Sequence, residues 1–340
     1  MKLIICCSHL YVPTTLTIIL SADKSESFSI YTDKPSIVKL FESLALPNCE
    51  IILDDFHADI GIVEIIFQRQ VTKYKKEIIK RIQQYQISKI YFFHDGYCEQ
   101  ANWIMKKLYE LNDIPICYNS ISPSYDDSFP YLRKNLVYFK LKTIYFLLWN
   151  LNVISIKIGY SYIPFMSPSF YTSLKVINTN IISNYNLTNK LLTDKLLPKN
   201  LFPVRSNILL LQCTYVDIMI TKEKYTETIN LIIDRIGSER FVFKPHPDQM
   251  KQFGKETACM VMPDFISANL LYYRFNAYLG YESAALAEAA NMGVLSISLV
   301  NVIPSYDNGK KDSIYKYLLS LSDNVKFPCS VEETVALLNA

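Results

Sequence analysis

The sequence predicts an α/β protein built from two parallel-sheet halves. Short β-branched strand patterns alternate with longer helical patterns from the first residues onward, and a second series of the same kind begins near Asn207. The length of 340 residues exceeds what one hydrophobic core usually supports. We therefore expect two domains, with a first over residues 1–195 and a second over residues 196–340.

The first half contains five runs typical of strands, each short, apolar and bounded by polar residues. They are Leu3–Cys7, Ser27–Tyr31, Glu50–Leu53, Lys89–Phe93 and Pro115–Asn119. The clearest helix lies between the third and fourth runs, over Arg69–Gln86, where Tyr74, Ile78 and Ile82 recur at helical spacing. Strand, helix and strand in this order indicate a parallel sheet.

The second half repeats this alternation. Its expected strands are Ile208–Cys213, Arg240–Phe243, Ala258–Met262, Ala277–Gly280 and Val294–Ser298. The Ala-rich run that starts at Ala284 has the highest helix propensity in the chain, and Ser283 before it is a natural N-cap. Both halves are thus Rossmann-like, and we expect their strand ends to face a central cleft.

Composition excludes several classes of protein. The 50% hydrophobic content excludes a disordered chain, and a net charge of +3 is far from the concentrated positive field that selects nucleic acid. The eight cysteines are scattered, which indicates reduced core residues, and no signal peptide is visible, so we expect a cytoplasmic protein. The longest apolar stretch, Thr143–Ile156, is short of the ~20 residues that span a bilayer.

Residues 120–199 are rich in Tyr, Phe, Asn and Lys, and their pattern assigns no clear elements. Their aromatic side chains suit core and interdomain packing or a wall that faces an acceptor sugar. Lysines interleaved with these aromatics also leave peripheral contact with an inner membrane open. These lysines are Lys134, Lys140, Lys142 and Lys157.

The strongest candidate for chemistry is His246, which follows the Phe241–Phe243 strand pattern between Pro245 and Pro247. The two prolines restrict the backbone, so the histidine is held in an extended loop and its side chain is positioned in advance. A histidine titrates near neutrality, so it can transfer a proton or, as a cation, neutralise a phosphate. Lys244 adds a positive charge nearby.

The second candidate is the helix start at Ser283. Free N–H groups and a hydroxyl at a helix N-terminus bind an anion, so one phosphate can dock there without a Gly-rich loop. The third candidate is the carboxylate pair Asp126 and Asp127, in which mutual repulsion raises one pKa toward that of a base. Asp95, after another strand, is its rival. No DxD triplet occurs, which favours a site without metal.

The order of these motifs, Asp126-Asp127-Ser128, then Lys244-Pro245-His246-Pro247, then Ser283-Ala284-Ala285, resembles the bacterial sialyltransferases. Within them it is most similar to glycosyltransferase family 52, the lipooligosaccharide and capsule group. The resemblance implies a GT-B fold, CMP-sialic acid as donor substrate, a galactose-type glycan hydroxyl as acceptor, and no cofactor.

By similarity, Asp127 or Asp126 is the general base, His246 is the general acid or phosphate stabiliser, and Ser283 holds the donor phosphate. Ser128 stands where the family has Gly, whereas Asp95 is followed by Gly96, so the base stays open between Asp127 and Asp95. The remaining residues expected on the donor side are Thr214, Lys244, Pro247, Asn269, Gly280 and Glu282.

Other functions stay open at this point. Asn269 stands where such enzymes often have Glu, so a UDP-sugar donor or a nucleotide-sugar epimerase remains an alternative. A non-catalytic glycan-assembly or membrane-surface protein is the alternative of another class. The sequence does not decide between a monomer and a homodimer.

Overall fold

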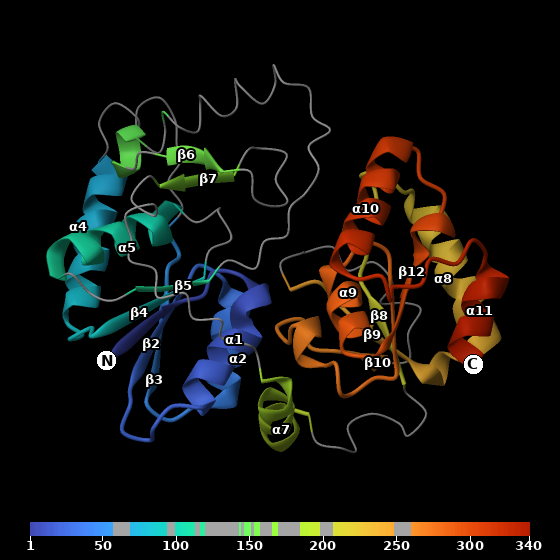
Figure 1. Cartoon of the computed structure of the whole chain (residues 1–340), viewed down its shortest axis with the longest axis horizontal. Helices are drawn as coiled ribbons and strands as arrows, with labels where there is room; N and C mark the ends of the chain where they lie inside the picture. The colour runs from blue at the N-terminus through green and yellow to red at the C-terminus, as the bar shows by residue number, and fades with distance from the viewer. Residues whose placement is uncertain are drawn as a thin grey trace. The chain divides into compact units, whose positions relative to one another are not determined.

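The computed structural model describes residues 1–56, 69–93, 99–112, 116–119, 143, 146–150, 153–156, 165–168, 184–197, 207–247 and 260–340. The chain divides into two compact units, Met1–Phe41 with Ala45–Ser183, and Asn184–Ala340 with Glu42–Leu44. Each unit is built on one five-stranded sheet (Figure 1).

The sheet of the first unit has the order β3-β2-β1-β4-β5, and every neighbouring pair is parallel. Its strands are β1 (Lys2–Ile5), β2 (Phe28–Thr32), β3 (Cys49–Leu53), β4 (Lys89–Phe93) and β5 (Ile116–Asn119). The helices between them are η1 (His9–Tyr11), α1 (Val12–Leu20), α2 (Pro35–Leu44), α4 (Arg69–Gln83) and α5 (Glu99–Asn112).

The central strand β1 explains the layering of this unit. Leu3, Ile4 and Ile5 are all fully buried, as a parallel strand covered by helices on both faces requires. Leu3 and Ile5 belong to the core cluster that also contains the buried faces of α4 and α5. Val71, Tyr74, Ile78 and Ile82 supply the face of α4 in that cluster.

A short segment of the aromatic region packs on the same two helices. Trp149 is 1% exposed, and its ring lies 5.9 Å from the ring of Tyr74 and 6.4 Å from that of Trp103. The Lys75 ammonium donates to the Leu148 carbonyl and lies 5.3 Å from both tryptophan rings, and its burial lowers its pKa to about 8. Trp149 is therefore a core residue, as one of the interpretations of the aromatic region predicted.

The sheet of the second unit repeats the topology, with the order β10-β9-β8-β11-β12 and parallel pairing throughout. Its strands are β8 (Ile208–Leu211), β9 (Phe241–Lys244), β10 (Met260–Val261), β11 (Ala277–Gly280) and β12 (Leu295–Ser298). Its helices are α7 (Tyr185–Lys195), α8 (Lys222–Ile236), α9 (Ala284–Asn291), α10 (Asn308–Leu321) and α11 (Val331–Asn339), with η3 (Ser238–Arg240), η4 (Ala268–Leu270) and η5 (Leu299–Asn301).

Helix α7 belongs to the second unit, which begins at Asn184. The Tyr185 ring lies 5.3 Å from that of Tyr272, and Arg274 donates to the Leu197 carbonyl over 2.6 Å. These contacts attach α7 to the second unit, beside η4. The main segment of that unit therefore starts at Asn184, whereas the sequence predicted a start at residue 196. The segment precedes the first strand of the repeated series, so the alternation carries no signal for it.

The structure confirms the α/β class and the two Rossmann-like sheets of the GT-B prediction. Each of the ten expected strands is present, with ends within two residues of those expected. Outside these sheets, β6 (Val153–Ile156) and β7 (Phe165–Pro168) form an antiparallel pair that the sequence did not predict. Among the described helices, none combines the length and the hydropathy needed to cross a membrane.

Gly280 ends β11 where the backbone passes close to β8. A Cβ at this position would lie 3.1 Å from the Leu211 Cβ and 3.4 Å from its Cδ1. We expect Gly280→Ala to lower the free energy of unfolding by about 1–2 kcal/mol, because neither strand can move aside inside the sheet. Urea unfolding monitored by circular dichroism measures this change.

Gly309→Ala is the matched control, since its nearest neighbour is Asp307 Oδ1 at 3.6 Å and it lies in α10. There we expect an unchanged protein or one stabilised by up to about 1 kcal/mol. Equal unfolding midpoints for Gly280→Ala and the parent would show that the two strands are not in close contact at this point.

Candidate functional site

The second unit has its topological switch point at β8, which lies between β9 and β11 in the sheet. After β8 the chain forms β9 and β10 on one side of this strand, and it then forms β11 and β12 on the other side. Open α/β sheets bind ligands at the carboxyl ends of strands around such a point. The loops that start there carry Gln212–Thr214, Pro245–Pro247 and Tyr281–Ser283.

His246 is held by the loop that follows β8. Its backbone N–H donates to Gln212 Oε1 over 2.8 Å, and the Gln212 N–H donates to the Lys244 carbonyl over 3.0 Å. Gln212 is buried, whereas His246 and Pro247 are partly exposed. The glutamine therefore fixes the backbone of the Pro-His-Pro loop and leaves the histidine at the edge of the sheet.

Lys244 is 2% exposed at the end of β9. Its ammonium donates to the Pro245 carbonyl and, over 3.1 Å, to the Asp264 carbonyl. Burial lowers its pKa to about 7, and the charge of Asp264 opposes that shift. These contacts show Lys244 tying together the loops after β9 and β10, which differs from the donor contact that the sequence suggested.

Ser283 begins α9 directly after β11. Its Oγ accepts from the Ala285 N–H over 3.3 Å, and its carbonyl accepts from the Leu286 N–H over 3.0 Å. The predicted N-cap is thus confirmed, and α9 directs its positive dipole end to the carboxyl edge of the sheet. This edge can bind an anion through N–H groups and a hydroxyl.

Thr214 and Glu282, both expected on the donor side, bind each other across the ends of β8 and β11. Glu282 Oε1 accepts from Thr214 N and from Thr214 Oγ1, each over 2.6 Å. Burial raises the pKa of Glu282, and the two Thr214 donors oppose this shift. The carboxyl group is therefore turned into the protein, where it joins two loops of the site.

Buried polar side chains surround this contact. Burial and the nearby charge of Glu282 raise the pKa of the Cys213 thiol, and burial raises the pKa of the Tyr225 and Tyr281 phenols. These groups stay protonated near neutral pH. They form the support behind the sheet edge and supply no nucleophile to it.

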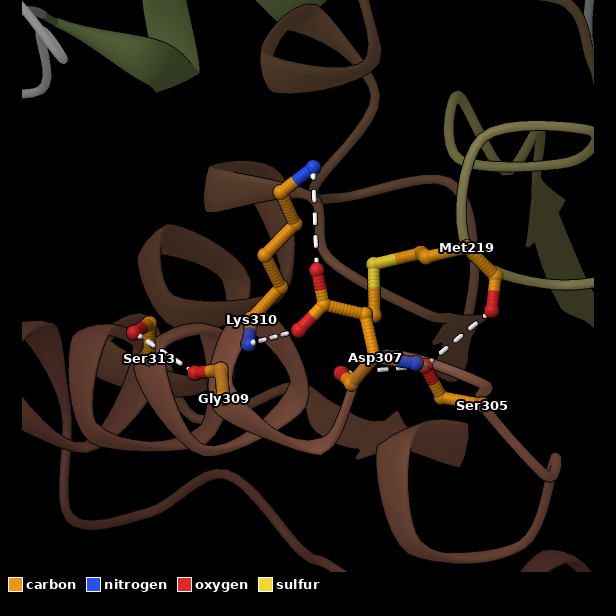
Figure 2. A network of polar contacts seen from close by, with 6 residues as sticks. All are labelled: Met219, Ser305, Asp307, Gly309, Lys310 and Ser313. Atoms are coloured by element: carbon orange, nitrogen blue, oxygen red, sulfur yellow. Dashed lines mark hydrogen bonds and ion pairs between the residues drawn. The ribbon is translucent and has the colours of Figure 1, made fainter.

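The loops after β8 and β12 are tied to each other, as Figure 2 shows. The Met219 carbonyl accepts from Ser305 Oγ over 3.0 Å and from Tyr306 N over 3.1 Å. Asp307 then caps α10 by accepting from the Lys310 N–H over 3.0 Å (Figure 2). Because β11 lies between β8 and β12 in the sheet, this tie joins loops that follow two strands on either side of β11.

The first unit also gathers polar groups at the carboxyl edge of its sheet. Asp54, after β3, accepts from the hydroxyls of Tyr31 and Tyr74 and, over 3.1 Å, from the Phe56 N–H. Burial raises the pKa of Asp33, which follows β2, and the ammonium of Lys34 partly offsets this. Among the described carboxyl groups at this edge, Asp33 is the one whose pKa is raised.

Asp95, Asp126 and Asp127 lie outside the described residues. Asn269 is 4% exposed in η4, so its side chain lies inside the second unit. Gly280 allows the close approach of β11 to Leu211 of β8.

Sequence reasoning missed Gln212 and Asp33. Each is a polar residue just after the carboxyl end of a buried parallel strand. That position in the sequence could have identified both residues as candidates for the site.

Comparison with known proteins adds little beyond the fold. No family model and no curated protein matches the chain. Among solved structures, the glycotransferase of kitacinnamycin has 9% identity and a TM-score of 0.46, covering 99% of this chain and 89% of that one. The UDP-GlcNAc 2-epimerase of Methanocaldococcus jannaschii has 14% identity and a TM-score of 0.44, covering 100% and 92%. The spinosyn rhamnosyltransferase SpnG has 11% identity and a TM-score of 0.41, with both chains covered completely.

Lys244 gives the protein a specific pH dependence. Its pKa of about 7 in the folded state lies below the 10.5 of an ordinary lysine, so between these values the unfolded chain binds the additional proton. Stability from this group therefore rises with pH above 7. Relative to Lys244→Met, we expect the parent to gain about 1 kcal/mol per pH unit between pH 7 and 9, measured by urea unfolding. The control is Lys316→Met, at an exposed position on α10, for which the stability difference from the parent should not change with pH. A stability difference between the parent and Lys244→Met that also stays constant with pH would contradict a lowered pKa for Lys244.

The Thr214–Glu282 contact predicts energetic coupling. In a double-mutant cycle of Thr214→Val and Glu282→Gln, we expect a coupling free energy of about 1–2 kcal/mol, because Thr214→Val removes the hydroxyl donor and Glu282→Gln replaces the charged acceptor of this partly buried hydrogen bond with a neutral one. Thermal unfolding of the four proteins measures it. Thr214→Val combined with Glu227→Gln, on the exposed face of α8, is the control and should be additive. Additive effects in the first cycle would mean that the contact contributes nothing.

Proposed function

We propose that the protein is an inverting, metal-independent glycosyltransferase that moves sialic acid from CMP-sialic acid to a galactose-type hydroxyl of a bacterial surface glycan. One observation carries the proposal. The Pro-His-Pro loop after β9 and the Ser283-capped start of α9 flank the carboxyl end of β8. This placement offers an acid and an anion site at one sheet edge.

The donor phosphate is proposed to bind at the start of α9. Ser283 and the first N–H groups of this helix supply hydrogen-bond donors, and the helix dipole favours a negative charge there. Strands β9 and β11 are separated by β8, so their ends lie roughly 10 Å apart. That span suits one phosphate with the sugar attached to it.

His246 is proposed to act on the leaving group. As CMP departs, charge develops on its single phosphate, and a protonated imidazole can neutralise this charge or transfer its proton. The Gln212 contact holds the backbone of His246 in place, so little reorganisation is needed during the reaction. A histidine and helix N–H groups therefore suffice for a leaving group with one phosphate.

A carboxylate is proposed to deprotonate the acceptor hydroxyl from the opposite face of the sugar, which gives inversion at the anomeric carbon. The sequence proposes Asp127, with Asp126 and Asp95 as alternatives.

The test uses CMP-sialic acid with a galactose-terminated acceptor. We expect His246→Ala to lower kcat/KM by about 10²- to 10⁴-fold, since it removes the proton donor. Ser283→Ala should raise the dissociation constant of CMP roughly ten-fold. Ser330→Ala is its control, because Ser330 caps α11 in the same way and should leave CMP affinity unchanged.

Each other outcome points to a different conclusion. Full transfer by His246→Ala would remove the role of His246. Thermal stabilisation by UDP in place of CMP would favour a UDP-sugar transferase or an epimerase, since a nucleotide at 100 times its Kd stabilises by about 2.7 kcal/mol. Stabilisation by neither nucleotide would favour the non-catalytic alternative.

A further inference from the structure

The carboxyl edge of the first sheet carries a group of polar side chains at its own topological switch point. This point is β1, because the chain forms β2 and β3 on one side of the strand and β4 and β5 on the other. Open α/β sheets bind ligands at the carboxyl ends of strands around such a point. The loops that follow β1 and β2 there carry Cys7–Leu10 and Asp33–Ser36.

Hydrogen bonds hold these two loops side by side. The pairing of β1 with β2 continues beyond the end of β1 through a further backbone hydrogen bond of 2.9 Å. The Cys7 thiol then donates to the Asp33 carboxylate. Further along both loops, His9 Nε2 lies 2.8 Å from Ser36 Oγ, within hydrogen-bond distance. The loops are thus joined at two points, and Asp33 and Ser36 belong to one local cluster.

Three described carboxyl groups follow strands at this edge, Asp33 after β2 and Asp54 and Asp55 after β3. Asp54 is 5% exposed and accepts from two tyrosine hydroxyls, so it belongs to the interior. Asp55 follows the outermost strand, two strands away from the switch point. Asp33 follows the strand next to β1, and its side chain is 30% exposed. It is therefore the carboxylate that can meet a ligand at the switch point.

The surroundings of Asp33 suit a group that takes up a proton. Burial raises its pKa, the Lys34 ammonium and the Cys7 thiol oppose this shift, and the charge of Asp54 adds to it. The net shift is upward, so this carboxylate is a stronger base than an ordinary aspartate. The contact with Lys34 is 3.9 Å long between partly exposed side chains, so water screens it.

The cluster suits a neutral ligand with hydroxyl groups. Asp33 and Lys34 carry opposite charges close together, so they do not create the one-sided field that attracts an ion. The carboxylate oxygens of Asp33 accept from hydroxyl groups, and the hydroxyl of Ser36 donates as well as accepts. A sugar presents hydroxyl groups of this kind, as the acceptor in the proposed function does.

We propose that Asp33 is the general base that takes the proton of the acceptor hydroxyl, and that Ser36 binds the acceptor sugar beside it. As the proton passes to the Asp33 carboxylate, the acceptor oxygen forms a bond to the anomeric carbon of sialic acid. The bond from that carbon to the phosphate oxygen breaks, and its electron pair leaves with CMP. The inference rests on the proposed function, because that reaction needs a base, and it gives Asp33 the role for which the sequence proposes Asp127.

The test measures transfer of sialic acid from CMP-sialic acid to lactose. We expect Asp33→Asn to lower kcat by about 10²- to 10⁴-fold, because the amide cannot take up the proton. The dissociation constant of CMP should stay unchanged, since the donor is proposed to bind to the second unit. Ser36→Ala should raise KM for lactose roughly five-fold without changing kcat, as the loss of one neutral hydrogen bond predicts.

The pH profile separates a base from a structural residue. Acidification protonates Asp33, so kcat/KM of the parent should fall toward low pH, and the residual activity of Asp33→Asn should lack this fall. Asp33→Glu keeps a carboxyl group, so it should be faster than Asp33→Asn and should keep the fall at low pH.

The matched control is Asp23→Asn, an exposed position in the loop before β2 and thus at the opposite edge of the sheet. It should keep kcat within about two-fold of the parent. Circular dichroism checks that each variant is folded. Transfer by Asp33→Asn at the parental rate would overturn the inference and leave the proposed function intact. A loss in Asp33→Asn that comes with weaker CMP binding, or that leaves the parental pH profile unchanged, would also overturn it. Absence of transfer by the parent would contradict the proposed function, and this inference with it.

Discussion

One buried side chain, Gln212, fixes the part of the second unit on which its chemistry depends. Its amide oxygen accepts from the His246 N–H, and its own N–H extends the pairing of β8 with β9. Because two prolines already restrict the loop, these contacts leave His246 little backbone freedom. Without the amide, a backbone N–H at the sheet edge would lose its acceptor, which costs about 1–3 kcal/mol where water cannot replace it.

The same sheet edge contains two ionisable groups that form hydrogen bonds within the protein. The ammonium of Lys244 binds two backbone carbonyls, and the carboxyl of Glu282 binds both donors of Thr214. A buried charge is costly unless hydrogen bonds compensate for it, and in both residues burial shifts the pKa toward the neutral form. These groups therefore act as links between loops, and the proposed function assigns the contact with the donor to His246 and the start of α9.

The sequence was informative where structure depends on neighbouring residues. Apolar runs located the strands, and Ser283 before an Ala-rich run located the start of α9, because strand burial and N-capping are local properties. Contacts between distant residues left no such pattern. Thr214 and Glu282 are 68 residues apart, and Gln212 and His246 are 34 apart, so their pairing depends on which strands become neighbours in the sheet. Lys244 was expected on the donor side because its charge is visible in the sequence, whereas the two carbonyls that accept from its ammonium are not.

The arrangement around Ser283 is compatible with a glutamate that directly precedes the proposed anion site. An ionised carboxylate next to the first turn of α9 would compete with a phosphate for the helix dipole and its N–H groups. Glu282 is instead turned toward Thr214, which donates to its Oε1 from both N and Oγ1. Burial raises the pKa of Glu282, and the two Thr214 donors oppose this shift. The Thr214 contact thus gives this carboxyl group hydrogen-bond donors of its own, so that it does not depend on the first N–H groups of α9.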